Sequence, residues 1–111
     1  MANSLPHDED GWTVALPLDE LWEGEMLGLR LGDADVLLVN LGEGGIHAYE
    51  NRCPHARARL SEGLLSAGTI RCVLHHWEFD LRTGNGINPR TCGLRRYAVR
   101  IEDGLVKVWV R

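Results

Sequence analysis

Short apolar runs separated by turn-forming residues place the strongest limit on what this chain can fold into. The runs cover residues 12–16, 26–31, 36–41, 46–49, 97–101 and 105–110, and Gly, Asp or Asn residues break the chain between them. Their period is two nearly throughout, which is typical of strands, whereas an amphipathic helix needs a period near 3.6. Asp103 and Gly104 between the last two runs are a strong β-hairpin signal. The sequence therefore predicts an all-β domain, built as a small barrel or sandwich.

The length of 111 residues fits one domain with a modest core. Residues 1–10 are polar and acidic without apolar periodicity, so we expect a flexible tail followed by a single domain over residues 11–111. The middle of the chain, about residues 51–92, is rich in turn residues and contains all three cysteines. So much irregular chain in a small domain needs something to organise it, and a metal site would do so.

The overall charge excludes some partners and favours others. Twelve Lys and Arg stand against 16 Asp and Glu, so the formal net charge is −4. This balance argues against nucleic acid as a partner, and it predicts that the chain meets a basic docking patch on another protein. No apolar run approaches the roughly 20 residues that span a bilayer, and residues 1–10 lack the pattern of a secretion signal. We therefore expect a cytoplasmic protein that does not bind membranes.

Two mixed pairs of metal-binding residues carry the chemistry. Cys53 and His55 form a Cys-x-His motif, Cys72 and His75 form a Cys-x2-His motif, and 16 residues separate His55 from Cys72. A tetrahedral zinc would use all four side chains on one ion, but zinc sites usually pair Cys with Cys and His with His. A Rieske [2Fe–2S] cluster would place both cysteines on one iron and both histidines on the other. The spacing favours the cluster over zinc.

The remaining candidates have simpler interpretations. Three cysteines cannot all pair in disulfides, and Cys92 has no neighbouring histidine, so we interpret it as a structural thiol. His76 adjoins a predicted ligand but is off the Cys-x2-His spacing. His7 and His47 are expected to be ordinary tail and strand residues.

These motifs and their surroundings resemble Rieske ferredoxins, and more narrowly the ferredoxin component of toluene-type diiron monooxygenases. The similarity extends over about residues 12–110. Beyond the ligand motifs, it is carried by residues 19–26 (DELWEGEM), 36–40, 45–49 (GIHAY), 60–63 (LSEG), 75–79 (HHWEF) and 83–89 (TGNGINP). The ligand motifs are specific for Rieske centres in general, and the WEGEM and GINP elements favour the monooxygenase branch.

The resemblance implies a fold and a site. We expect a β-sandwich base domain with a smaller cluster-binding subdomain inserted at about residues 51–90. Its ligands would be Cys53, His55, Cys72 and His75, with both histidines at an exposed tip. Pro89 would belong to a proline-bearing loop over the cluster. Two arginines, Arg57 and Arg59, depart from the family pattern; they would dock a partner, stabilise the reduced cluster, or be solvated surface.

Two aromatic residues near the cluster bear on its reduction potential. High-potential Rieske proteins have Ser and Tyr hydroxyls after the second ligand pair and a disulfide between the loops. By this resemblance, the corresponding residues of this chain are Trp77 and Phe79, and neither has a hydroxyl. The one cysteine that remains besides the proposed ligands cannot form a disulfide between the loops. Hydrogen bonds to the cluster sulfurs tune these centres over about −150 to +300 mV. We therefore expect a potential at the low end of this range.

The resemblance implies an electron carrier rather than an enzyme. It would pass single electrons from a flavin-containing NADH oxidoreductase to a diiron hydroxylase in aromatic hydrocarbon catabolism. One alternative is the ferredoxin of a ring-hydroxylating dioxygenase. A free-standing Rieske-like subunit of a reductase is another, and a zinc-stabilised binding module without a redox role is an alternative of another class.

Overall fold

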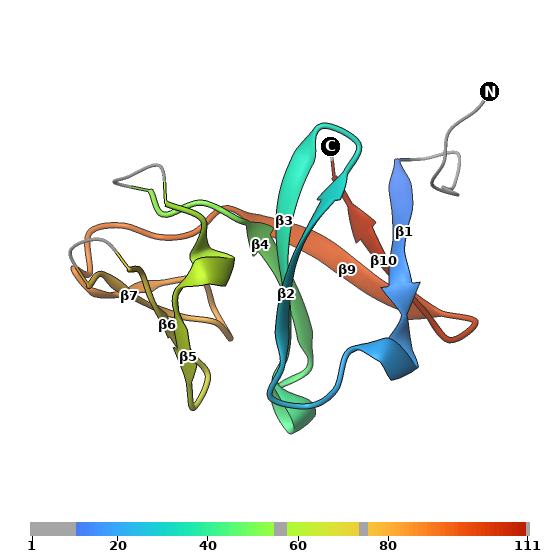
Figure 1. The fold of residues 1–111 in the computed structure, drawn as a ribbon, viewed down its shortest axis with the longest axis horizontal. Helices are drawn as coiled ribbons and strands as arrows, with labels where there is room; N and C mark the ends of the chain where they lie inside the picture. Colours follow the sequence, from blue (N-terminus) through green and yellow to red (C-terminus); the bar gives the residue numbers. More distant parts are fainter. Residues whose placement is uncertain (1–10, 55–57, 74–75, 111) are drawn as a thin grey trace.

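The computed structural model describes residues 11–54, 58–73 and 76–110, which form two antiparallel sheets (Figure 1). The larger sheet contains β1 (Trp12–Pro17), β2 (Met26–Leu31), β3 (Ala34–Asn40), β4 (Ile46–Glu50), β9 (Arg96–Glu102) and β10 (Leu105–Trp109). The smaller contains β5 (Leu64–Ser66), β6 (Thr69–Arg71), β7 (Glu78–Asp80) and β8 (Gly86–Asn88). Short 3-10 turns occupy η1 (Leu18–Glu20), η2 (Gly42–Gly44) and η3 (Leu60–Glu62), and this part of the chain contains no α-helix. The predicted tail over residues 1–10 lies outside the described residues.

The larger sheet has the strand order β1-β10-β9-β4-β3-β2, and its two end strands also contact each other. The predicted hairpin joins β9 to β10, where Glu102 pairs with Leu105 across a two-residue turn. Both turn residues have positive φ, 55° at Asp103 and 75° at Gly104, as a tight hairpin with right-handed twist requires. The all-β prediction is confirmed, and each of the six predicted apolar runs matches a strand of this sheet to within a few residues.

Strand β3 explains why residues 36–41 are continuously apolar. Val36 and Leu38 are fully buried in one core, together with Ala48 and Val106 of the same sheet. Leu37 and Val39 point to the opposite face and are fully buried in a second core beneath the smaller sheet. Because both faces of β3 are covered, neither set of alternating positions is polar.

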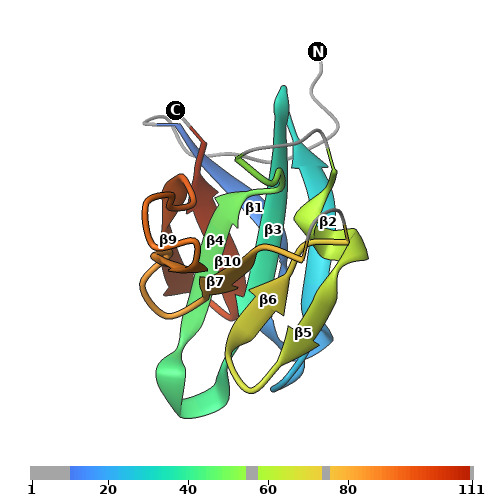
Figure 2. The same ribbon diagram turned by 90° about the vertical axis from the view of Figure 1, so that its left-hand side faces the viewer.

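The smaller sheet lies between β4 and β9 in the sequence and packs in front of β3 and β4 in space (Figure 2). The prediction of an irregular middle segment was therefore wrong for this sheet. Each of its strands has three residues, too few to show alternation. No helix in the described ranges is both long and apolar enough to cross a membrane.

Candidate metal centre

The two predicted ligand loops begin at buried cysteines and close in the same way. Cys53 and Cys72 are both fully buried and belong to the second core. The Cys53 N–H donates to the carbonyl of Ala58 at 3.0 Å, and the Cys72 N–H donates to the carbonyl of Trp77 at 2.7 Å. Each bond closes a loop from a cysteine to the residue five positions ahead. The predicted ligands His55 and His75 belong to these loops but lie outside the described residues.

The surroundings of the two thiols fit an iron–sulfur cluster. Of the three cysteines, all of which the structure describes, none forms a disulfide. Two buried thiols therefore converge on one apolar core from two matching loops, and thiolates are the ligands that iron–sulfur clusters require. Within residues 11–54, 58–73 and 76–110, no three potential metal-binding side chains gather at one point. A centre built from both loops needs the two histidines that stand outside these ranges.

The aromatic residues predicted next to the cluster lie in or against the core that contains Cys72. Phe79 on β7 is fully buried in the same core, and Trp77 is half-buried against it. The structure thus places both side chains beside the second ligand loop, with the Trp77 carbonyl closing that loop.

A third loop, between β8 and β9, contains Pro89 and Cys92. Pro89 follows a cis peptide bond and is half-buried. Cys92 packs against the second core. A Cβ atom added to Gly86 would collide with the carbonyls of both residues, so this loop returns over β8 without room for a side chain. The loop is held at its other end by the bridge between Asn85 and Gly93.

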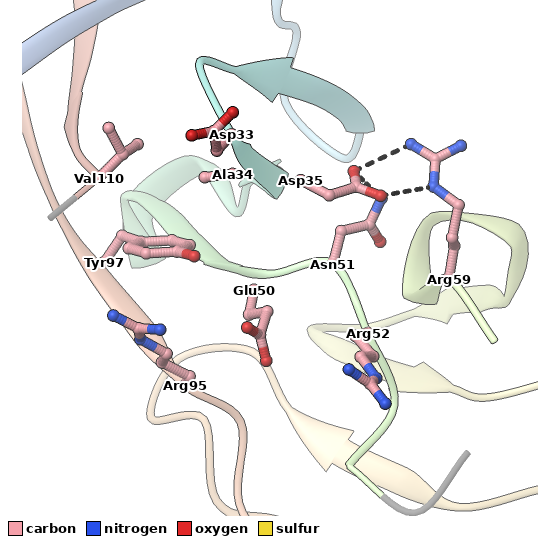
Figure 3. A pocket seen from close by; sticks show the side chains of 10 residues that line it. All are labelled: Asp33, Ala34, Asp35, Glu50, Asn51, Arg52, Arg59, Arg95, Tyr97 and Val110. Carbon is pink, nitrogen blue, oxygen red and sulfur yellow. Dashed lines mark hydrogen bonds and ion pairs between the residues drawn. The ribbon is translucent and has the colours of Figure 1, made fainter. Parts of the chain in front are cut away.

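A polar network that the sequence did not reveal holds the first ligand loop to the larger sheet (Figure 3). Asn51 is 2% exposed, and its Nδ2 donates to Asp35 Oδ1 at 3.1 Å and to Ser61 Oγ at 2.9 Å. Its Oδ1 accepts from the Ser61 N–H at 2.8 Å. Gly28 on β2 makes room for this contact, because a Cβ there would lie 2.5 Å from Ser61 Oγ. No motif marks these residues, and Asn51 stands out only by its place two residues before Cys53.

Arg59 completes this network through a two-point ion pair. Its Nε donates to Asp35 Oδ2 at 2.9 Å and its Nη2 to Asp35 Oδ1 at 3.0 Å. Burial raises the pKa of Asp35, but the hydrogen bonds from Arg59 and Asn51 and the nearby positive charges outweigh this effect. The pKa of Asp35 therefore lies below its usual value. Arg59 thus anchors its loop to β3, while Arg57 lies outside the described residues.

An open cleft of about 430 Å³ borders this network, between β3 and the start of β9 (Figure 3). Its lining is mostly charged, with Arg52, Arg59 and Arg95 on one side of the balance and Asp33, Asp35 and Glu50 on the other. It lies beside the first ligand loop, and Figure 3 shows Arg52 close to that loop.

Two further residues on β4 have structural contacts. The hydroxyl of Tyr49 donates to the carbonyl of Leu81 at 2.7 Å, and burial raises the pKa of Tyr49, which keeps this donor protonated. One ring nitrogen of His47 lies 2.7 Å from the Gly44 carbonyl and the other 2.7 Å from the Arg96 guanidinium. Because a guanidinium only donates, Nδ1 of His47 accepts and Nε2 donates. Both ring nitrogens of His47 are therefore engaged in structural contacts, in agreement with its interpretation as an ordinary strand residue.

Known proteins resemble this chain along most of its length. The sequence profile of the Rieske [2Fe-2S] domain matches residues 11–98. The ferredoxin component of the alkene monooxygenase system of Xanthobacter autotrophicus is 36% identical over 108 residues, which are 96% of this chain and 88% of that protein. The ferredoxin component of naphthalene 1,2-dioxygenase/salicylate 5-hydroxylase systems of Ralstonia sp. is 37% identical over 93 residues, 83% of this chain and 88% of that protein.

The fold of this chain also resembles that of a solved structure. A chain in the complex of reduced oxygenase and oxidized ferredoxin in carbazole 1,9a-dioxygenase superposes with a TM-score of 0.81 at 28% identity. The match covers 91% of this chain and 94% of that chain.

Proposed function

This chain belongs to the Rieske [2Fe–2S] family, and on that premise we propose that it carries single electrons from an NADH-dependent flavin reductase to the hydroxylase of a diiron monooxygenase. The chain is a Rieske ferredoxin, an electron-carrier component of a multicomponent oxygenase system. Its [2Fe–2S] cofactor follows from the family, and this answers the zinc alternative. The monooxygenase partner, the reductase and the ligand set are the proposed parts.

The proposed ligands are Cys53 and Cys72 on one iron and His55 and His75 on the other. The observation that carries this assignment is the burial of both cysteines in one core, each at the start of a loop closed by the same backbone bond. The cluster would supply one reversible electron. The chain's own residues would fix its position: the thiols hold its inner side, and apolar neighbours such as Phe79 keep water from it. The predicted insert of about residues 51–90 would form this holder.

The ligand assignment is tested by absorption and EPR spectra of the purified protein before and after dithionite reduction. We expect a red-brown protein with a Rieske-type reduced signal. Cys72→Ser and His75→Ala should remove that signal, whereas their matched controls, Cys92→Ser and His76→Ala, should keep it. Loss of the signal in a control with retention in its partner would overturn the assignment.

The choice of a monooxygenase partner rests on the WEGEM and GINP elements and on the length of the similarity. The alkene monooxygenase ferredoxin aligns with 96% of this chain, against 83% for the naphthalene dioxygenase ferredoxin, although the identities are nearly equal. The partner is tested by measuring NADH-dependent turnover with a diiron hydroxylase and, separately, with a ring-hydroxylating oxygenase, each with its own reductase. Faster turnover with the second enzyme would favour the dioxygenase alternative.

We propose a cytoplasmic location, as expected for electron transfer from NADH.

The absence of hydroxyls at Trp77 and Phe79 supports a reduction potential at the low end of the Rieske range. Both side chains lie in or against the core that contains Cys72, and neither an indole nor a phenyl ring carries an O–H group that could donate to a cluster sulfur. A redox titration monitored by EPR should give a midpoint below 0 mV. A positive midpoint would refute this argument.

A further inference from the structure

The charges of this chain are divided between its two structural units. The segment between β4 and β9, residues 51–95, contains seven arginines, no lysine and three carboxylates, a formal charge of +4. We name it the basic segment. The remaining residues contain five basic and thirteen acidic side chains, a charge of −8, and the two parts add up to the −4 of the whole chain. The net charge of −4, from which a basic patch on the partner was expected, is therefore not evenly distributed along the chain.

The basic charges are on the surface, and the acidic charges of the same segment are less accessible. All six arginines of the basic segment that the structure describes are exposed: Arg52, Arg59, Arg71, Arg82, Arg90 and Arg95. Of its three carboxylates, Glu62 is exposed, whereas Glu78 and Asp80 are half-buried. Glu78 is also paired with Arg71 at 3.5 Å, and Arg59 is paired with Asp35 of the larger sheet. Six exposed arginines against these three carboxylates leave the segment's own surface with an excess of positive charge, although Arg52, Arg59 and Arg95 share their cleft with Asp33, Asp35 and Glu50.

Three of these arginines border the loops that would hold the proposed cluster. Arg52 immediately precedes Cys53, Arg71 immediately precedes Cys72, and Arg90 follows Pro89 in the third loop. Each of the three loops around the proposed centre thus carries an exposed arginine at its border. In physiological salt the Debye length is about 8 Å, so a partner at these loops responds to the local charge more than to the distant acidic residues.

We propose that the basic segment is the docking surface and that its partner presents an acidic patch there. This rests on the proposed function, because it names the chemistry of the protein that exchanges electrons with this carrier. Opposite charges speed and orient such brief encounters, and they weaken as salt increases. The acidic larger sheet would repel the same patch, so the carrier would approach with its loops first.

The first experiment measures binding of an acidic probe to the holoprotein. Fluorescence anisotropy with a labelled ten-residue poly-aspartate peptide at low salt should show binding that salt abolishes. Arg90→Glu should weaken it by roughly two- to fivefold or more, as expected for an exposed charge pair. The matched control is Arg30→Glu, an equal charge change at an exposed site on β2, which should have less effect. Equal weakening by both variants, or no binding by the parent protein, would overturn the proposal.

The second experiment uses the sign of a salt dependence. Stopped-flow oxidation of the dithionite-reduced protein by ferricyanide transfers one electron and yields ferrocyanide. If the positive loops govern the encounter, this rate falls as ionic strength rises, and the rate with the cation hexaamminecobalt(III), which is reduced to cobalt(II), rises. The opposite signs would mean that the net charge of −4 governs the encounter, and they would refute the proposal.

These results remain separable from the proposed function. The absorption and EPR spectra of the same sample report whether the cluster is present. A protein that binds poly-aspartate through Arg90 but lacks a cluster would overturn the electron-carrier mechanism and not the acidic partner. A red protein with a Rieske signal but no preference for the anionic probe would overturn only the docking surface.

Discussion

Replacing Asn51 by alanine should loosen the first ligand loop and destabilise the fold together. The side chain is 2% exposed and takes part in three hydrogen bonds, two to Ser61 and one to Asp35. Each is worth about 1 kcal/mol net, and the variant also leaves the Ser61 N–H without its acceptor. We therefore expect Asn51→Ala to lower the free energy of unfolding by roughly 2–4 kcal/mol, a decrease of about 9–17 °C in melting temperature.

A matched variant separates stability from the position of the loop. Asn40 also bridges two backbone segments, since its Nδ2 donates to the Leu21 carbonyl and its Oδ1 accepts from the Gly42 N–H, both at 2.8 Å. It touches neither ligand loop in these bonds. Asn40→Ala should cost roughly 1–2 kcal/mol. Thermal unfolding by circular dichroism and the rate of colour loss below the melting temperature are the two measurements.

The two variants should differ in the rate of colour loss by more than their stabilities explain. When both are compared at equal distances below their own melting temperatures, Asn51→Ala should lose its visible absorption faster, because, among the described residues, the side-chain hydrogen bonds that tie its first loop to β3 are then those of the Arg59–Asp35 pair alone. Equal rates would mean that Asn51 contributes only to general stability, and the positional argument would fail.

Three smaller effects follow from single contacts. Tyr49→Phe removes the donor to the Leu81 carbonyl and should lower the stability by about 1–2 kcal/mol in denaturant unfolding; no change would mean that water replaces the hydroxyl. Arg59→Gln should lower the melting temperature at pH 7, and this effect should shrink as the pH falls below about 4, because the pKa of Asp35 is depressed in the folded state and the pair is lost only when Asp35 becomes protonated there; a loss that stays constant down to the lowest pH at which the protein folds would refute this. Gly86→Ala should prevent cluster incorporation, since its methyl group would collide with two carbonyls, and normal colour in this variant would contradict it.

The strands of the larger sheet could be predicted because each is long enough to show alternation or, in β3, a continuous apolar run. The run over residues 46–49 and the Asp103–Gly104 turn lie where the sequence placed them. The three-residue strands β5 to β8 could not be predicted, because tertiary contacts with the second core decide their conformation rather than local alternation. The two cysteines could be predicted as a pair from their spacing, and the structure brings both into one core.

The polar support of the site was invisible in the sequence. Asn51, Asp35 and Ser61 are ordinary residues at separations of 16 and 10 positions, and only the fold brings them together. Arg59 departs from the family pattern in the sequence, but its partner on β3 could not be inferred without the register of the sheet. The distribution of charge could have been counted from the sequence, but it had no meaning until β4 and β9 defined where one unit ends and the other begins.

Because β3 packs against both cores, residues 51–95 cannot be transferred to another protein as an independent unit. The ends of this segment lie close together, because Tyr49 before it and Arg96 after it are paired on adjacent strands. This geometry alone would allow the segment to be grafted. The packing of the segment is incompatible with such a graft, because Leu37 and Val39 of β3 form part of the wall against which the segment is buried. A graft of residues 51–95 onto a foreign hairpin would carry the ligands but not that wall. Engineering of such carriers must therefore transfer the facing strand together with the loops.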